Sequence, residues 1–372
     1  MNLSLARALL ALTAGLGLAL AANAASYSSH LKDGSPTLQS VGSIAFGPEG
    51  ILFVADQKAA KIYALATGDT KASSSGGTYK ISDIDSKVAA SLGASADQVQ
   101  IHDLAVNPIS RNAWLSVSRG RGANAQAIIM KISAAGKLSV LDLNGIAYAE
   151  VGLPNAPEDK VVGEGRRAKN KRMEAITDMA YVNEQLIVAG LSNEEFASNL
   201  RSIPFPFRNS SQGASIEIYH GAHGKFETHS PVRTFVPFDF GGGDVQVVAA
   251  YTCTPLVTFP LSALKPKAHV MGKTIAELGN RNRPLDMVVY SKDGSDYLLM
   301  ANSSRGVMKV ETIEFDKLPS IDAKVADTQG AAYNTVANWE GVEQLDLLDA
   351  KNALILQKSE SGSRSLLSLA LP

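Results

Sequence analysis

Short apolar segments recur along most of the chain, and their hydrophobic and polar positions alternate with a period of two. One form, apolar-x-Asp-apolar-Ala-apolar, occupies 101–106, 176–181 and 284–289, and degenerate copies occupy 41–46 and 342–347. Each copy is followed by a turn, a second apolar segment and a third alternating segment. Strands separated by Gly, Asn and Ser turns are typical of all-β proteins. The repeated three-strand pattern predicts an array of similar sheets.

The second and third strands of these units are expected at 51–56 and 61–65, 113–118 and 127–132, 186–190 and 214–219, 297–302 and 306–310, and 353–357 and 365–369. A further unit has strands at 245–250 and 256–261, and its inner strand, 234–238, lacks the Asp and contains Pro237. Proline is normally confined to edge strands or bulges, so this inner strand could be irregular. Six units predict one six-bladed β-propeller, with seven blades as the alternative.

The first 24 residues have the pattern of a secretory signal peptide. A single early charge, Arg7, precedes an apolar run over 8–22, and Ala22-Asn23-Ala24 is a small-x-small cleavage site. The run is shorter than the roughly 20 apolar residues that a membrane span requires. We therefore expect a signal peptide at 1–24, a propeller domain at 25–372, and a secreted protein in the periplasm of a Gram-negative bacterium, with no membrane insertion after cleavage.

Composition narrows the class of partner. The net charge of −1 argues against nucleic acid, which requires a basic surface. The one cysteine, Cys253, cannot form an internal disulfide, and a chain of this size does not need one. We interpret it as a small buried hydrophobic residue. The expected partner is a small molecule or a periplasmic protein.

The segment 41–65, with its core Ile-Ala-Phe-Gly-Pro-Glu-Gly-Ile-Leu-Phe-Val-Ala-Asp, resembles an NHL-type repeat. The blade pattern as a whole is similar to the six-bladed propellers of the NHL-repeat and SMP-30/gluconolactonase-like superfamily. The segments 283–286 and 339–342 loosely resemble the entry motifs of SMP-30-like enzymes, in which Glu, Asn and Asp hold a divalent cation. Such repeats occur in binding proteins, scaffolds and enzymes alike, so the resemblance does not define an activity.

Aligned on the Asp motif, the residues expected at the channel mouth are Gln39, Val99, Glu174, Asn282 and Glu340. The resemblance implies that Glu174, Asn282 and Glu340 are metal ligands, and oxygen ligands suit Ca²⁺ or Mg²⁺. Val99 interrupts this ring, and the fourth blade offers no ligand. In the alternative interpretation Arg283 pairs with one Glu and no cation binds. Gln39, Arg172 and Arg283 are the candidate ligand-binding residues.

The repeated Asp103, Asp178 and Asp286 are candidates for a structural role and, for Asp103, a catalytic one. A residue that recurs in every blade usually forms structural hydrogen bonds, either to a turn or to a neighbouring blade. Asp103 is also a candidate catalytic residue together with His102, which could act as a general base. The series His220-x-x-His223-x5-His229 raises a zinc site, although its Gly-rich segment favours a β-turn.

Two insertions could contribute to function. The basic run 165–172 could steer an anionic ligand toward the channel or form a solvated loop. The segment 192–208 mixes acidic and aromatic residues and is expected to form a lid or a partner contact. The primary prediction is a periplasmic protein that binds a small ligand or a protein partner through its channel face and loops. The alternatives are a divalent-metal-dependent hydrolase or lactonase and, on weaker grounds, a quinone-linked redox subunit.

Overall fold

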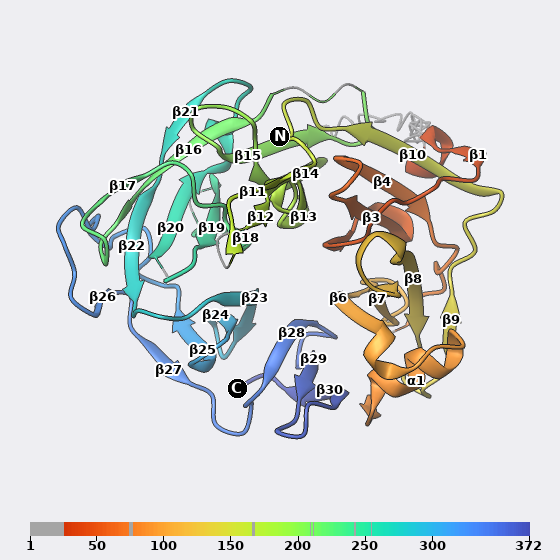
Figure 1. The fold of residues 1–372 in the computed structure, drawn as a ribbon. Coiled ribbons are helices and arrows are strands. Elements are labelled where there is room, and N and C mark those ends of the chain that lie inside the picture. The colour runs from red at the N-terminus through yellow and green to blue at the C-terminus, as the bar shows by residue number, and fades with distance from the viewer. Residues whose placement is uncertain are drawn as a thin grey trace, which may run out of the picture.

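The computed structural model describes residues 26–73, 77–165, 168–208, 210, 212–241, 243–253 and 255–372. The predicted signal peptide lies outside these residues, as do Arg166 and Arg167 of the basic run. The strands of the described residues form six sheets arranged in a ring (Figure 1). The prediction of an all-β, six-bladed propeller is confirmed, and the seven-bladed alternative is wrong.

The blades are numbered along the chain, and their strands are given from the channel outward. Blade 1 contains β2 (Ile44–Phe46), β3 (Ile51–Asp56), β4 (Lys61–Ala66), β10 (Ile146–Gly152) and β1 (Lys32–Gly34). Blade 2 contains β6 (Val99–Val106), β7 (Ala113–Arg119), β8 (Gln126–Ile132) and β9 (Leu138–Val140). Blade 3 contains β13 (Asp178–Val182), β14 (Gln185–Leu191), β15 (Ser198–Pro204), β16 (Ala214–His220) and β17 (Lys225–Glu227), with β21 (His269–Met271) parallel to β16.

Blade 4 contains β18 (Thr234–Asp239), β19 (Val245–Ala250), β20 (Pro255–Pro260), β22 (Lys273–Leu278) and β26 (Thr328–Gly330). Blade 5 contains β23 (Pro284–Lys292), β24 (Ser295–Asn302), β25 (Gly306–Glu311) and β27 (Tyr333–Thr335). Blade 6 contains β28 (Val342–Leu347), β29 (Asn352–Lys358), β30 (Arg364–Ala370) and β5 (Lys80–Ile81). A ribbon of β11 (Val161–Val162) and β12 (Lys169–Asn170) lies outside the blades.

Helices are short and lie in the connections between strands. The α-helix α1 spans Ile84–Ser91, and 3₁₀ turns occupy Tyr27–His30, Pro48–Gly50, Ala96–Gln98, Gly122–Asn124, Lys171–Glu174 and Leu261–Ala263. Within the described part of the chain, no helix has the length and apolarity needed to cross a membrane.

The order of the blades around the ring differs from their order along the chain. The inner strand β2 packs against both β6 and β13, while β6 packs against β28 on its other side. The order in space is therefore 2-1-3-4-5-6, as Figure 1 shows. The chain leaves blade 1 after β4, adds β5 to the outside of blade 6, builds blade 2, and returns to add β10 to blade 1. These exchanged outer strands tie the first blade to the second and the last.

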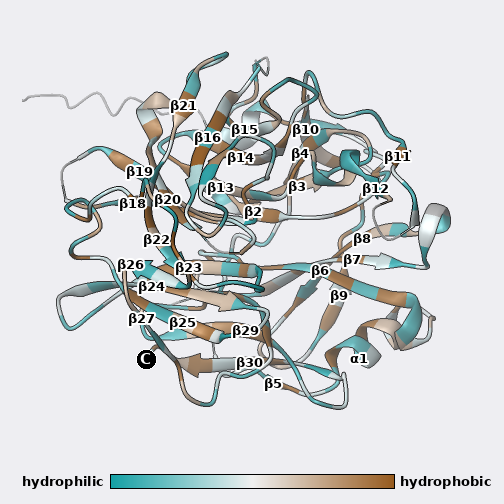
Figure 2. Ribbon diagram, turned by 60° about the vertical axis from the view of Figure 1, so that its left-hand side comes forward, coloured by the Kyte–Doolittle hydropathy of each residue, from teal (hydrophilic) through white to brown (hydrophobic). Residues whose placement is uncertain are grey.

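The core consists of six hydrophobic clusters, and each lies between two neighbouring blades. In β3, Phe53 packs toward blade 3 while Leu52 and Val54 pack toward blade 2. Successive side chains of a strand point to opposite faces, and both faces of a blade are covered. This explains why the middle strands are continuously apolar while the connecting turns are hydrophilic (Figure 2).

Blade 3 departs from the prediction. The segment expected as an exposed lid contains β15, which pairs with β14 along its whole length. Phe205, which follows β15, is 2% exposed and packs edge-on against Phe53 with ring centroids 4.9 Å apart. The lid prediction is wrong for this part of the segment, because Phe205 and Phe207 pack into the cluster between blades 1 and 3, whereas Phe196 stays exposed.

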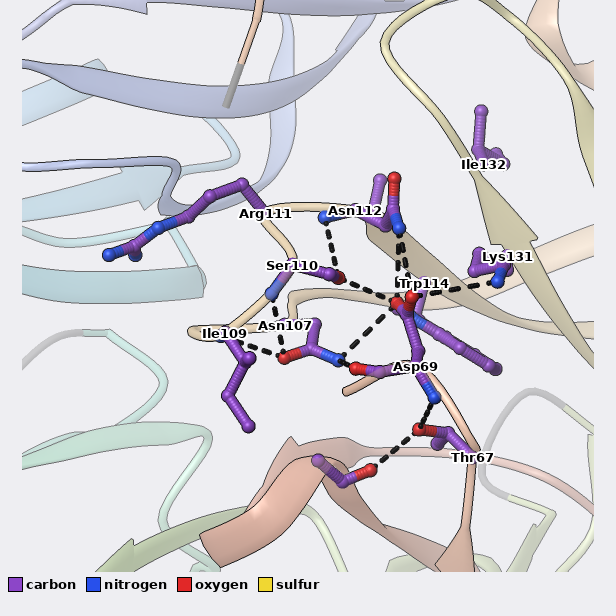
Figure 3. Close-up of polar contacts among 12 residues, drawn as sticks. Thr67, Asp69, Asn107, Ile109, Ser110, Arg111, Asn112, Trp114, Lys131 and Ile132 are labelled. Carbon is purple, nitrogen blue, oxygen red and sulfur yellow. Dashed lines mark hydrogen bonds and ion pairs between the residues drawn. The ribbon is translucent and has the colours of Figure 1, made fainter. Parts of the chain in front are cut away.

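Asp69 holds the junction between blades 1 and 2. It follows β4, is 6% exposed, and accepts hydrogen bonds from the Ser110 hydroxyl at 2.6 Å, the Asn112 amide at 3.0 Å and Trp114 Nε1 at 3.1 Å (Figure 3). Lys131 Nζ lies 3.6 Å from the same carboxylate. Burial alone would raise the pKa of Asp69, but these donors and the Lys131 charge outweigh it and lower the pKa. Because the four partners belong to blade 2, Asp69 fixes that blade against the end of blade 1.

Candidate functional site

The inner strands of the six blades surround a central channel that contains two adjoining cavities. The smaller cavity, of about 150 Å³, has polar walls that include His102, Thr177 and Arg233. The larger, of about 530 Å³, is lined mainly by apolar residues of the inner strands. Asp103, Asp178 and Asp286 line both cavities, so a layer of carboxylates separates the polar half of the channel from the apolar half.

The three aspartates occupy the same position of the repeated motif and form the same contacts. One oxygen of each accepts the N–H of the following residue, and the other accepts an inner-strand N–H of the next blade. Asp103 reaches Ile44 at 2.7 Å, and Asp178 reaches Phe235 at 2.9 Å. Asp286 reaches Leu345 of blade 6 at 2.9 Å. These contacts point the same way around the ring, and they confirm the structural role expected for the repeated Asp.

Other residue types fill the equivalent position in the remaining blades. Gln344 occupies it in blade 6. With its amide nitrogen turned toward the carboxylates, Gln344 donates to Asp103 Oδ1 at 2.8 Å and to Asp286 Oδ2 at 3.0 Å. Asp346, two residues further along β28, repeats the inter-blade contact one step deeper by accepting Val106 N–H at 2.7 Å. A fourth carboxylate therefore lies below the layer.

Burial raises the pKa of all four carboxylates, and neighbouring negative charges add to the effect at Asp103 and Asp286. Burial raises the pKa of Asp103 to about 8, and the negative charges of Asp178 and Asp346 add to the effect. Burial also raises the pKa of Asp178 and of Asp346 to about 6. The pKa of Asp286 lies well above its usual value, first because of burial and then because of Asp103. At neutral pH the layer therefore retains protons that free aspartates would have lost.

Both signs of charge line the polar cavity. Arg233 donates from Nη1 to Glu174 Oε1 at 2.9 Å and from Nε to Thr252 Oγ1 at 3.1 Å. His102 Nε2 lies 2.9 Å from Ser118 Oγ, and burial lowers the pKa of His102, with a smaller effect from the charge of Arg121. Its imidazole is therefore neutral at neutral pH, beside the carboxylate layer.

The predicted catalytic pair lies in the cavity, whereas none of the three candidate ligand-binding residues lines it. His102 and Asp103 both contribute to its wall. Gln39 has an exposed side chain, and its backbone N–H donates a hydrogen bond to Asp56 Oδ2 at 2.6 Å. Arg172 donates to the carbonyls of Pro157 and Lys58, which fixes two loops.

Arg283 lies beside the cavity. It lines a groove of about 1110 Å³ together with Glu340, and this groove shares Leu285 and Gln344 with the polar cavity. Partial burial lowers the pKa of Arg283, and the neighbouring charge of Arg233 contributes in the same direction. Arg283 is thus placed at the mouth of the channel.

The three predicted metal ligands do not form a ligand set. Glu174 is paired with Arg233. Asn282 is 4% exposed; its amide nitrogen donates to the Gly279 carbonyl at 2.7 Å, and its amide oxygen accepts from Asn302 at 2.9 Å. No hydrogen bond or ion pair between these described residues joins two of the three. Because Glu174 is neutralised and Asn282 is already saturated, these residues do not fit a divalent cation.

Sequence reasoning missed several residues of the cavity, namely Ser43, Gln57, Thr177, Arg233 and Gln344. Three of them could have been identified from the sequence. Ser43 and Gln344 occupy the Asp position of degenerate repeats, and Thr177 precedes Asp178. Gln57 and Arg233 lie in connections whose direction the repeat does not specify.

No model of a known protein family matches the sequence, and no curated protein matches it. Among solved structures, the PQQ-bound aldose sugar dehydrogenase of Streptomyces coelicolor is 11% identical, with 91% of this chain and 96% of that chain covered and a TM-score of 0.36. The periplasmic gluconolactonase of Pseudomonas aeruginosa is 11% identical, with 89% and 88% covered and a TM-score of 0.35. The GH43 endo-arabinanase of Bacillus licheniformis is 13% identical, with 73% and 94% covered and a TM-score of 0.37.

Similarities at this level assign no activity to the chain. The six blades themselves show the architecture that the resemblance to SMP-30/gluconolactonase-like propellers implied, and at the level of the fold that resemblance is confirmed.

Proposed function

We propose that the protein binds a small, uncharged, hydroxyl-rich molecule, such as a monosaccharide or a sugar lactone, in the polar half of its central channel. The observation that carries the proposal is the cavity of about 150 Å³ whose wall combines carboxylates, amides, hydroxyls, an imidazole and a guanidinium. A hydroxyl group both donates and accepts hydrogen bonds, so a polyol can satisfy such a mixed wall. A few well-placed polar groups are what orient a ligand in a pocket.

The charges favour a neutral ligand. An anion would meet Asp103, Asp178 and Asp286, while a cation would meet Arg233. Burying an unpaired charge is costly, so a strongly charged ligand of either sign is disfavoured. Retained protons on the carboxylates also lower the repulsion of ligand oxygens. The groove beside Arg283 gives the ligand a route to the cavity.

Replacing Gln57 with alanine tests this assignment. Gln57 lines the cavity, and loss of one hydrogen bond to the ligand is expected to weaken binding by about tenfold. Sugars, sugar lactones, sugar acids, phosphate and Ca²⁺ would be screened by thermal shift, and hits measured by isothermal titration. Gln39→Ala is the matched control, since its side chain lies outside the cavity. Binding of charged compounds only, or equal affinity in Gln57→Ala and wild type, would exclude the site.

Hydrolysis of a lactone is the second candidate function. The neutral imidazole of His102 lines the cavity and could take a proton from an attacking water. The predicted metal ligands do not assemble, so this activity would rest on the protein's own groups. Consumption of a bound lactone by wild type, with its loss in His102→Ala, would favour hydrolysis over binding alone.

We also propose that the chain is exported to the periplasm, because its first 24 residues have the pattern of a cleavable signal peptide. The expected mature N-terminus is Ala25. The mature N-terminus can be measured by mass spectrometry of the protein from a periplasmic fraction. A cytoplasmic enzyme serves as the fractionation control. Recovery of the intact 372-residue chain from the cytoplasm alone would contradict export.

A further inference from the structure

A hairpin at the outer part of blade 3 brings two histidines and a glutamate together. The strands β16 and β17 are joined by a turn that follows His220. His220 Nδ1 lies 3.0 Å from Glu227 Oε2, and His223 Nδ1 lies 2.6 Å from Glu227 Oε1. One ligand atom from each of the three residues lies within 4.8 Å of the others. The two imidazoles and the carboxylate therefore lie close enough together to share one ion after a small adjustment.

Two buried groups beside this cluster lack a hydrogen-bond partner. They are Nε2 of His220, which is 2% exposed, and Oε2 of Glu277, which is fully buried on β22 of blade 4. The other oxygen of Glu277 accepts the N–H of Gly221, the residue after His220, at 2.5 Å. Buried polar groups are normally paired, so two unpaired groups beside one cluster require an explanation.

A metal ion accounts for both groups. In the hydrogen-bonded arrangement, Nδ1 of His220 donates to Glu227, so Nε2 carries no proton and is a buried acceptor without a donor. When Nδ1 binds a metal, the proton moves to Nε2, which becomes a donor in the neighbourhood of the unpaired Glu277 oxygen. Metal-bound histidines usually donate their second ring N–H to a carboxylate or carbonyl in this way.

We propose that His220, His223 and Glu227 bind a divalent transition metal ion, of which Zn²⁺ is the best match, and that Glu277 orients His220. Imidazole and carboxylate ligands suit zinc, whose bonds of about 2.0–2.2 Å place ligand atoms about 3.3 Å apart in a tetrahedron. The two histidines contact different oxygens of Glu227, at 3.0 and 2.6 Å, and all the ligand atoms lie within 4.8 Å of one another, so side-chain adjustments of about 1 Å would bring them to these spacings. The side chain of His223 is 48% exposed, which leaves a fourth position open to solvent.

The surrounding charges set the strength of this site. Lys225 Nζ lies 3.9 Å from Glu227 Oε1 and opposes a cation, whereas the unpaired Oε2 of Glu277 offers an acceptor for the ring of His220 once His220 binds a metal. His229, the third histidine of the sequence motif, contacts Thr228 instead, and Glu227 takes its place. Because Glu277 belongs to blade 4, a bound ion would connect the outer strands of blades 3 and 4.

A zinc titration of the purified protein, without a histidine tag and in competition with a chromogenic chelator, tests the proposal. We expect one equivalent bound with micromolar or tighter affinity at neutral pH and a melting temperature that rises with zinc. His223→Ala, an exposed change that leaves the fold intact, is expected to weaken binding at least about 100-fold. Glu277→Gln should weaken it by about 10–100-fold. Co²⁺ substituted for zinc should give a tetrahedral absorption spectrum in wild type only.

His269→Ala is the matched control. His269 Nε2 pairs with Glu217 at 2.7 Å on adjacent strands of the same blade, and the structure shows no third ligand atom grouped with this pair among the described residues. The zinc affinity of His269→Ala should equal that of wild type. The proposal is overturned if wild type binds no zinc, if His223→Ala retains full affinity, or if His229→Ala or His269→Ala abolishes binding.

Discussion

Replacing Asp69 with alanine is expected to lower the free energy of unfolding by about 3–5 kcal/mol, the largest loss we predict for a single polar residue. The substitution removes the acceptor of Ser110, Asn112 and Trp114 and leaves these donors unpaired at the junction of blades 1 and 2. Lys131 would also lose its counter-charge. Urea unfolding, monitored by tryptophan fluorescence, measures the loss.

The variant Asp69→Asn tests the contribution of the negative charge of Asp69. Its amide oxygen retains an acceptor, but its NH₂ group would face donors, so this variant should also be destabilised. The pKa of Asp69 is lowered in the folded state, so its contribution is present above the unfolded value near 3.9 and is lost as the pH falls through the folded value. The difference in the free energy of unfolding between wild type and Asp69→Asn should therefore become smaller below about pH 4. Asp142→Ala, an exposed carboxylate, is the control, and an equal effect there would contradict the role of Asp69.

The carboxylate layer is expected to make the protein less stable as the pH rises from about 4 to about 8. The pKa of Asp103 is raised to about 8 in the folded state, so its stabilising contribution is complete below the unfolded value and is lost as the pH rises through the folded value. Asp178 and Asp346 act in the same direction up to about pH 6. We expect a loss on the order of 1–3 kcal/mol for Asp103.

Asp103→Asn separates this effect from other titrations. The variant retains an acceptor for Ile44 or Leu104 but carries no charge, so its stability should vary less between pH 5 and pH 8 than that of wild type. Asp103→Ala leaves both N–H groups unpaired and should be destabilised at either pH, by about 2–4 kcal/mol. Denaturant unfolding in buffer with a chelator measures all three proteins. Parallel pH profiles for wild type and Asp103→Asn would show that Asp103 does not titrate in this range.

The repeat pattern predicted the blades well because each inner and middle strand is short, apolar and bounded by turn residues. The strand predicted at 51–56 has the bounds of β3. The inner strand around Pro237 is β18, and the irregularity expected there is absent, since β18 pairs with β19 in unbroken register over Thr234–Asp239. The proline is tolerated because an innermost strand has one unpaired edge toward the channel. The exchange of β5 and β10 between blades could not be predicted, because outer strands pair with whichever edge the tertiary structure offers.

The candidate site was predicted in part. His102 and Asp103 line the polar cavity, as the motif on the inner strand indicated, and their catalytic role stays a prediction. The metal ring predicted at Glu174, Asn282 and Glu340 is not assembled among the described residues, because alignment by sequence position says nothing of local partners. Arg233 forms an ion pair with Glu174, and the side-chain amide of Asn302 donates a hydrogen bond to the amide oxygen of Asn282. Neither partner is near in sequence to the residue that it engages.

A crystal structure of the protein with the tightest-binding neutral ligand from the screen tests the central claim most directly. We expect electron density for the ligand in the polar half of the channel, above the carboxylate layer, with hydroxyl groups in contact with His102, Gln57 and Arg233. Density confined to the outer groove or to the loops, with an unchanged water-filled cavity between these residues, would contradict it.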